Sequence, residues 1–345
     1  MKGGSASRDS VTIEQGSGGS AMMKLISEVV LKNVTKWGKG GVTLMDLDDS
    51  GSLVCGDVEI VLTTDAHTVK PPFFPGGNIG TLAAAGTIND IAVMGVKPRA
   101  ISSSLVIEEG FRRADLSRII SSMNEVLEEV DVELITGDTK VVEKGDLDGI
   151  IITTSGIGVT QKGKVVRDNG LRPGDRIIVS GSVGDHGMAV LSVREGFDFE
   201  LKTKSDVGPV WEVVEAAMSA GRITAMKDPT RGGLANTLNE LASKSGVGIE
   251  INEELIPIKP DVASAAEMLG VDPYAITNEG KVVMGVGPQV AAKVLSRVRA
   301  TPRGREAVII GTAVKDHQGE VVMETRVGGR RLMEPPIGDP APRIC

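Results

Sequence analysis

Four aspartates of this sequence stand where carboxylates commonly bind metal ions. Asp65 ends the strand-like segment VEIVLTTD, Asp138 ends VELITGD, and Asp228 begins the turn DPTRGG. The fourth, Asp90, lies in the helix-like segment NIGTLAAAGTINDIAVMG. Oxygen ligands suit Mg²⁺, which keeps several waters and joins a few carboxylates to nucleotide phosphates. Singly, each aspartate is more simply a cap or turn residue, but four in small, glycine-rich surroundings predict a magnesium site.

A glycine-rich loop near the N-terminus could hold phosphate. The loop consists of Gly16, Ser17, Gly18 and Gly19. It precedes the predicted helix AMMKLISEVVLKNV, and glycine lets backbone N–H groups come close to an anion. The segment matches neither GxGxxG nor GxxxxGK[ST], so by itself a flexible loop is the simpler interpretation. Lys140 in GDTK and Arg231 in DPTRGG could add cations for a phosphate, or could be surface charges.

One of the two cysteines, Cys345, is the last residue of the chain. Position alone favours an incidental thiol, because terminal residues commonly fray. However, prolines at 335, 336, 340 and 342 make the preceding segment stiff and extended. Such a segment could present a thiol at a distance, as a carrier arm does.

Helix-like and strand-like segments alternate along the chain, which predicts an α/β fold in two domains. A cluster of turn-forming residues, RDNGLRPGD, separates them. We predict a leader over residues 1–12, an N-terminal domain over 13–160, a C-terminal domain over 170–328 and an extended tail over 329–345. Within the first domain VTIEQ is predicted as a short strand.

Composition excludes several classes of function. The chain has 345 residues and a net charge of −8, without basic runs interleaved with aromatic residues, which argues against nucleic-acid binding. We find neither an apolar stretch long enough to cross a bilayer nor a signal peptide, so we expect no membrane association and a cytoplasmic location. Two cysteines cannot form a disulfide framework, and each thiol needs its own explanation.

Motifs spread along the chain resemble those of the hydrogenase maturation factor HypE family. They are GSGG, PPFFPGGNIG, NDIAVMG, GDTKVV, VSGSVGDHG, DPTRGG, NEGK and the final PRIC, and the resemblance runs from about Ile13 to Cys345. TTD and DPTRGG are shared with the superfamily of aminoimidazole ribonucleotide synthetase, selenophosphate synthetase and thiamine phosphate kinase, whereas PRIC is specific. The resemblance implies that superfamily's two-domain α/β fold, a homodimer whose N-terminal domains pair into a β-barrel, and an ATP cleft between the pieces.

The resemblance also implies an ATP-dependent carbamoyl dehydratase that acts on its own tail. In such proteins HypF loads a carbamoyl group on the terminal thiol, dehydration gives a thiocyanate, and the HypC and HypD complex receives the cyano group for the iron of [NiFe] hydrogenase. It implies ATP and Mg²⁺ as cofactors and three catalytic residues: Cys345 carries the substrate, Glu279 is the base and Lys140 positions or stabilises charge. By motif position, ATP would contact Gly16, Ser17, Gly18, Gly19, Asn89, Thr139 and Arg231, and the metal would bind Asp65, Asp90, Asp138 and Asp228.

Two alternatives stay open at this point. A kinase or synthetase of the same superfamily that acts on a small free substrate would carry the same glycine and aspartate motifs, and only the tail distinguishes it. A non-catalytic adaptor could use the tail to dock on partners, but it would not hydrolyse ATP.

Overall fold

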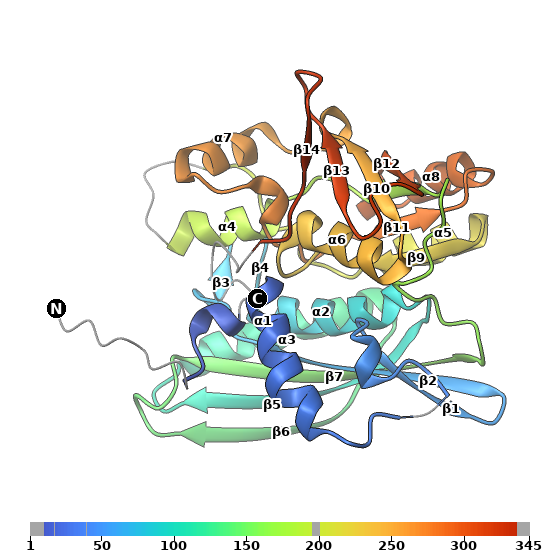
Figure 1. Cartoon of the computed structure of the whole chain (residues 1–345). Coiled ribbons are helices and arrows are strands. Elements are labelled where there is room, and N and C mark those ends of the chain that lie inside the picture. The colour runs from blue at the N-terminus through green and yellow to red at the C-terminus, as the bar shows by residue number, and fades with distance from the viewer. Residues whose placement is uncertain (1–9, 17, 39, 195–200, 337–345) are drawn as a thin grey trace.

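Two β-sheets, one from each half of the chain, form the framework of the molecule (Figure 1). The computed structural model describes residues 10–336 except 17, 39 and 195–200. A two-stranded hairpin, β3 (Phe73–Phe74) and β4 (Gly77–Asn78), precedes the first long helix. None of the helices in the described ranges is both long and apolar enough to cross a bilayer.

The first sheet has five strands in the order β1-β2-β7-β5-β6. They are β1 (Gly51–Cys55), β2 (Val58–His67), β5 (Pro98–Glu108), β6 (Glu133–Val142) and β7 (Ile150–Gln161). Only β5 and β6 pair in parallel, because helix α3 (Arg113–Val130) carries the chain back between them. Strand β6 ends the sheet, and along it every residue except Val142 is exposed.

One face of this sheet is open. Leu53 and Val159 flank Ile60 across the strand ladder, and Leu62 lies two residues further along the same face. Three of these residues are largely exposed: Leu53 is 54%, Leu62 is 56% and Val159 is 45% exposed. An apolar sheet face left in water favours association with another surface.

Helix α2 (Ile79–Val93) fills the space between the two sheets (Figure 1). Thirteen of its 15 residues are buried, which explains why its sequence lacks a polar face. Its Ala83 and Ile88 share one apolar cluster with Met188 and Ile276 from the second half of the chain. The two halves therefore share a core, and the packing of α2 on both sides fixes the position of the side chains at its C-terminal end.

The second sheet has seven strands in the order β14-β13-β10-β12-β8-β11-β9. They are β8 (Arg176–Val179), β9 (Ile223–Lys227), β10 (Gly248–Asn252), β11 (Val283–Val286), β12 (Val308–Val314), β13 (Val321–Glu324) and β14 (Arg330–Leu332). The helices of this half are α4 (Asp185–Arg194), α5 (Trp211–Ala220), α6 (Gly233–Ser245), α7 (Pro260–Leu269) and α8 (Ala291–Arg299). The fold is thus the two-domain α/β arrangement that the alternating segments predicted.

The first helical segment differs from its prediction. VTIEQ does not form a strand; residues Ile13–Gly16 form a 3₁₀-helix instead. The alternation of apolar and polar residues is too short there to specify a strand, and no sheet edge pairs with it. Helix α1 (Gly19–Leu25) follows and continues as a π-helical stretch, Ile26–Leu31.

The segment predicted as an extended tail begins as part of the second sheet. Residues 330–332 pair antiparallel with β13, and Met333, at 3% exposure, belongs to the core of this half. The amide of Asn239 on α6 donates a hydrogen bond of 2.7 Å to the Met333 carbonyl. The chain is therefore anchored as far as Met333.

Candidate functional site

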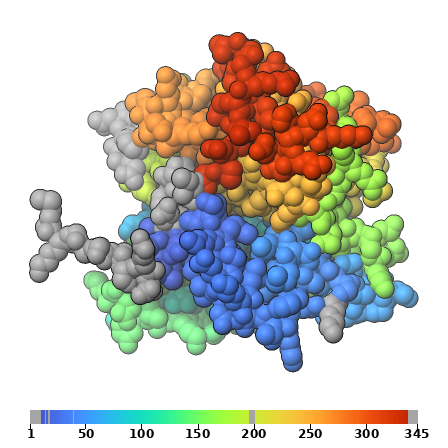
Figure 2. All heavy atoms as spheres, in the orientation of Figure 1, coloured from blue at the N-terminus to red at the C-terminus, as the bar shows by residue number. Residues whose placement is uncertain are grey.

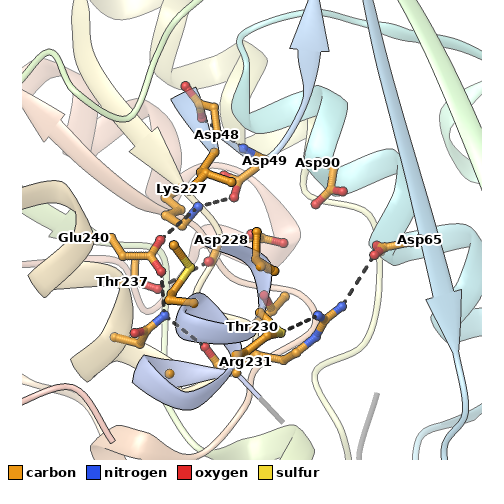
Figure 3. Close-up of a pocket in the computed structure, with 18 of the residues that line it drawn as sticks. Asp48, Asp49, Asp65, Asp90, Lys227, Asp228, Thr230, Arg231, Thr237 and Glu240 are labelled. Atoms are coloured by element: carbon orange, nitrogen blue, oxygen red, sulfur yellow. Dashed lines mark hydrogen bonds and ion pairs between the residues drawn. The ribbon is translucent and has the colours of Figure 1, made fainter. Parts of the chain in front are cut away.

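A pocket of about 250 Å³ lies between the two halves of the chain (Figure 3). Its wall is dominated by carboxyl groups. They belong to Asp48, Asp49, Asp65, Asp90, Asp228, Glu240 and Glu279. The cations among the lining residues are Lys227 and Arg231. Such a surplus of acids in a confined space is suited to metal cations rather than to a bare anion.

The N-terminal half contributes carboxylates from adjacent elements. Asp65 lies near the end of β2, and Asp90 lies near the end of α2, which packs on that strand. The Thr63 hydroxyl donates to the Asp90 carboxylate at 2.7 Å and lies 3.2 Å from the Asp49 carbonyl oxygen. Asp49 comes just before β1. Short connections thus bring three aspartates to one edge of the first sheet.

The C-terminal half contributes the turn that follows β9. Lys227 is the last residue of that strand, Asp228 follows it directly, and Arg231 comes two residues before α6. Asp228 is 4% exposed, and its Oδ2 has no hydrogen-bond partner among the described residues. This turn therefore carries two cations and a buried carboxyl into the pocket.

Two ion pairs connect the halves across the pocket (Figure 3). Arg231 Nη2 lies 3.6 Å from Asp65 Oδ1. Lys227 Nζ contacts Asp49 Oδ1 and lies 3.3 Å from Glu240 Oε2. Both cations thereby neutralise part of the acidic wall and hold the two halves against each other.

Burial and mutual repulsion raise the pKa of several of these carboxyl groups. Burial, followed by the charge of Asp49, raises the pKa of Asp228 to about 8. Burial, followed by the charges of Asp65 and Asp228, raises the pKa of Asp90 well above its ordinary value. The pKa of Glu279 is also raised well above its ordinary value, first by burial and then by Asp228. A divalent cation would relieve this repulsion.

The described residues contain no group of three or more His, Cys, Asp or Glu side chains already arranged to hold a metal ion. Two lining residues nevertheless have a buried carboxylate oxygen without a hydrogen-bond partner among the described residues, namely Asp49 Oδ2 and Asp228 Oδ2. Carboxylate oxygens, and no sulfur or paired imidazole ligands, are the donor set that Mg²⁺ prefers. The residues present therefore fit the predicted metal.

The glycine loop reaches the pocket through Gly18 and Gly19. Gly18 has φ +87°, and a Cβ there would lie 2.8 Å from Arg231 Cβ. Only glycine allows the loop to approach Arg231 so closely in this conformation. Gly16 is not among the lining residues, and Ser17 lies outside the described residues.

Glu279 lies in the pocket wall with 3% exposure, and its Oε1 has no hydrogen-bond partner in the described part of the chain. Asn89, predicted to contact ATP, lies behind this wall. Its amide nitrogen donates to the carbonyls of Gly208 (3.1 Å) and Glu279 (3.2 Å), and its Oδ1 accepts from Val210 N (2.8 Å). In this structure Asn89 thus contacts other parts of the protein and not the pocket.

The structure does not bring Asp138, Thr139 or Lys140 to the pocket of the same chain. They lie on edge strand β6, where the side chains of Asp138 and Lys140 are 62% and 71% exposed. Lys140 Nζ is 3.9 Å from Asp138 Oδ2. Cys345 lies outside the described residues.

Sequence reasoning missed several residues of the pocket wall. Asp48 and Asp49 are a pair of acids just before β1, whereas the aspartates identified from the sequence end a strand, begin a turn or lie in a helix. Lys227 directly precedes the DPTRGG motif, whereas Glu240 and His67 carried no sequence signal. His67 is buried, and burial lowers its pKa, so it is a neutral part of the wall.

Family models for the AIR synthase related protein match residues 47–160 (N-terminal domain) and 172–324 (C-terminal domain). Among curated proteins, a putative hydrogenase expression/formation protein of Methanocaldococcus jannaschii is 53% identical over 97% of this chain and 99% of its own length. Carbamoyl dehydratase HypE of Rhizobium leguminosarum bv. viciae is 46% identical over 97% of this chain and 95% of its own length.

Solved structures give the same match in three dimensions. A HypE–HypF complex contains a chain that superposes with a TM-score of 0.84 at 43% identity, over 90% of this chain and 99% of that one. The hydrogenase maturation protein HypE in complex with ATP superposes with a TM-score of 0.80 at 38% identity, over 97% of this chain and 100% of that one. The match therefore covers both halves of the chain and the pocket between them.

Proposed function

The chain belongs to the HypE family of carbamoyl dehydratases, and we propose that it dehydrates a carbamoyl group on its own Cys345 to a thiocyanate at the expense of ATP. The product would supply the cyanide ligands of the iron in a [NiFe] hydrogenase. The pocket between the two halves is the proposed reaction site.

One observation carries this proposal: the chain leads its own C-terminal segment to the pocket. A Cβ on Gly232 would lie 3.2 Å from Pro336 Cγ, and Gly232 is the neighbour of Arg231 in the pocket wall. In Figure 2 the last described residues, in red, run down to the seam between the halves, above the blue N-terminal segment. Nine residues follow Pro336, with a maximal reach of about 30 Å.

The proposed reaction has two steps. In the first, the carboxamide oxygen bonds to the γ-phosphorus of ATP, the bond to ADP breaks and one proton leaves the nitrogen. In the second, the bond from carbon to the phosphorylated oxygen breaks, phosphate departs and the second nitrogen proton leaves, which gives S–C≡N. Phosphorylation is needed because the oxygen of a carboxamide is a very poor leaving group.

ATP would be held by the two cations and the glycine loop of the pocket. Arg231 would pair with phosphate oxygens, and Gly18 and Gly19 would offer backbone N–H groups at close range. Asp49, Asp65, Asp90 and Asp228 would hold Mg²⁺, which would supply charge neutralisation for the triphosphate when bound. The raised pKa values of Asp49, Asp90 and Asp228 support this assignment, since repelling carboxylates gain most from a cation.

Glu279 is the proposed base for the nitrogen protons. Burial, followed by the charge of Asp228, raises the pKa of Glu279 well above that of an exposed glutamate, so its carboxylate would be a stronger base. It is buried in the wall, where water is largely excluded and a transferred proton does not exchange freely. Lys140 is proposed to position the amide or to stabilise its developing charge.

A homodimer would bring Asp138, Thr139 and Lys140 to this chemistry. All three lie on the exposed edge strand β6, and the same sheet exposes apolar residues on other strands, such as Leu53 on β1 and Leu62 on β2. We propose that two N-terminal sheets pair at these surfaces into a closed β-barrel, so that β6 of one copy lies beside the pocket of the other. Closure would also protect the unpaired edge of β6.

HypF is the proposed donor of the carbamoyl group, which agrees with the solved complex of a relative with HypF. The HypC and HypD complex is the proposed acceptor of the cyano group. We place these reactions in the cytoplasm, because they need ATP and a free thiol at Cys345.

Mass spectrometry of the C-terminal peptide tests the proposal. The chain is incubated with HypF, carbamoyl phosphate and magnesium ATP, and the peptide should first gain a carbamoyl group and then lose the mass of one water. Cys345→Ala should bind ATP normally and show neither change. Carbamoylated peptide that persists unchanged with ATP, while ATP binding is normal, would refute the dehydration.

A further inference from the structure

Glu279 lines the pocket, and its carboxylate oxygen Oε1 makes no hydrogen bond to any described residue. A buried side chain in that situation takes its position from its backbone. The backbone around Glu279 is an irregular turn before β11, so helix or strand geometry does not fix it. Other side chains must therefore hold it.

Asp206 fixes the backbone N–H groups of this turn. Its Oδ1 accepts from Glu279 N and its Oδ2 from Gly280 N, each at 3.3 Å. The Lys281 ammonium lies 3.4 Å from Oδ2 and holds the carboxylate in place. The side chain of Asp206 is only 3% exposed, so water does not compete for these bonds.

Asn89 fixes the backbone carbonyl group of Glu279. Its Nδ2 lies 3.2 Å from the Glu279 carbonyl oxygen, to which Gly208 N also donates at 3.3 Å. The other Asn89 bonds go to Gly208 O and Val210 N, close along the chain to Asp206. Asn89 directly precedes Asp90 on α2, so one amide connects the proposed metal ligands to the proposed base.

From these contacts we propose that Asp206 and Asn89 are positioning residues for the dehydration, which set the location of the Glu279 carboxyl relative to Asp90 and the bound substrate. The inference rests on the proposed role of Glu279. Asp206 is not among the residues that line the pocket, and its hydrogen bonds reach the wall through the backbone N–H groups of Glu279 and Gly280. Loss of either residue should therefore slow proton removal and leave ATP binding intact.

The test uses the full chain, carbamoylated with HypF and carbamoyl phosphate, and follows thiocyanate formation in a single turnover at a series of ATP concentrations. Asp206→Asn keeps the shape of the side chain but can no longer accept from both N–H groups. We expect the rate at saturating ATP to fall about 10-fold or more, because small displacements of a reacting group are costly, while the half-saturating ATP concentration stays within about 2-fold.

Two further variants keep the test decisive. Asn89→Asp retains the acceptor for Val210 N but places a carboxylate oxygen next to the carbonyl oxygens of Glu279 and Gly208, which it repels. It should therefore also lower the rate at saturating ATP and leave the half-saturating ATP concentration unchanged. Asp261→Asn is the matched control, because Asp261 also accepts from backbone N–H groups, those of Lys202, Thr203 and Val262, and none of these belongs to the turn at Glu279. Its rate should equal that of the unmodified chain, with thermal unfolding measured for all three.

Combination with Glu279→Gln separates a positioning role from general damage. If Asp206 acts through Glu279, then Asp206→Asn should add little to the loss already caused by Glu279→Gln. Independent, multiplicative losses, a normal rate in Asp206→Asn, or a raised ATP requirement with a normal rate would each overturn the inference. Absence of thiocyanate from the unmodified chain would instead refute the proposed function itself.

Discussion

Arg231 Nη2 and Asp65 Oδ1 lie 3.6 Å apart, so a cation from the second half of the chain covers a carboxylate from the first half. The guanidinium is about one-third exposed and therefore accessible from the pocket. A nucleotide phosphate that enters here would compete with Asp65 for Arg231, and a metal ion would compete with Arg231 for Asp65. ATP and metal together would replace the pair by two stronger interactions.

We therefore expect Arg231→Gln to weaken binding of magnesium ATP about 10-fold, because a charge-assisted contact to phosphate is lost. Isothermal titration calorimetry measures the change. Arg303→Gln is the control, since its guanidinium pairs with Glu129 at 3.1 Å outside the pocket. Equal affinity of the Arg231 and Arg303 variants would contradict the phosphate role.

The pKa of about 8 at Asp228 predicts how stability depends on pH in the metal-free protein. The unfolded chain releases this proton near its ordinary pKa of 3.8, whereas the folded chain retains it up to about pH 8. Folded protein binds more protons in that range, so its free energy of unfolding falls as pH rises. Asp228→Asn removes this effect.

Thermal unfolding without metal should thus show Asp228→Asn to be more stable than the unmodified chain at pH 8, by roughly 5 °C, with a much smaller difference at pH 4. Magnesium should stabilise the unmodified chain more at pH 8 than at pH 5 and have little effect on the variant. The reverse pH trend would show that Asp228 is ionised in the metal-free pocket.

Mixed dimers test whether Asp138 serves the pocket of the other copy. Asp138→Asn and Asp228→Asn should each be inactive alone. In a dimer of one copy of each, one pocket would lack both aspartates and the other would have both, so activity should return to about half of normal per mixed dimer. Separately tagged copies purified together provide the sample, and unmixed variants are the controls.

If Asp138 instead served its own chain, neither pocket of the mixed dimer would be complete. Thiocyanate formation would then stay at the level of the single variants, and the proposed pairing of β6 with a second copy would be wrong.

Met333→Ala should lower the free energy of unfolding by about 2–4 kcal/mol, because it leaves a cavity in a core where Met333 is only 3% exposed. The neighbouring Leu332 is 47% exposed, so Leu332→Ala should change stability by less than about 1 kcal/mol. Urea unfolding followed by circular dichroism compares the two. Similar values for both would show that the second half of the chain does not anchor the tail at Met333.

Local patterns were sufficient to predict much of the pocket. Asp65, Asp228, Arg231 and Gly18 were identified from element ends and turn motifs, and in the structure all of them line the same pocket. These residues share a local signature, because a short polar or glycine-rich segment follows or precedes an apolar strand or helix. The alternating segments predicted the two-domain α/β fold for the same reason.

Other features depend on contacts that local patterns do not encode. Asn89 lies beside Asp90 in sequence but bonds to Glu279, 190 positions away, so its direction follows from tertiary packing. Asp138 has the same signature as Asp65, yet it lies on the outermost strand, and strand order is not apparent from one strand's sequence. Residues Ile13–Gly16, most of which belong to VTIEQ, form a 3₁₀-helix because no neighbouring strand pairs with this segment.

The anchor at Met333 determines how the proposed substrate meets the catalyst. Eleven residues, 334–344, separate the anchor from Cys345, so this chain length limits the distance from Met333 to Cys345 to about 40 Å. A tether of this length corresponds to an effective concentration in the millimolar range, whatever the concentration of the protein. Dehydration should then be first order and insensitive to dilution of the assembled enzyme, and the pocket needs almost no intrinsic affinity for a carbamoyl group. Free thiocarbamates at micromolar levels would not compete with the attached one.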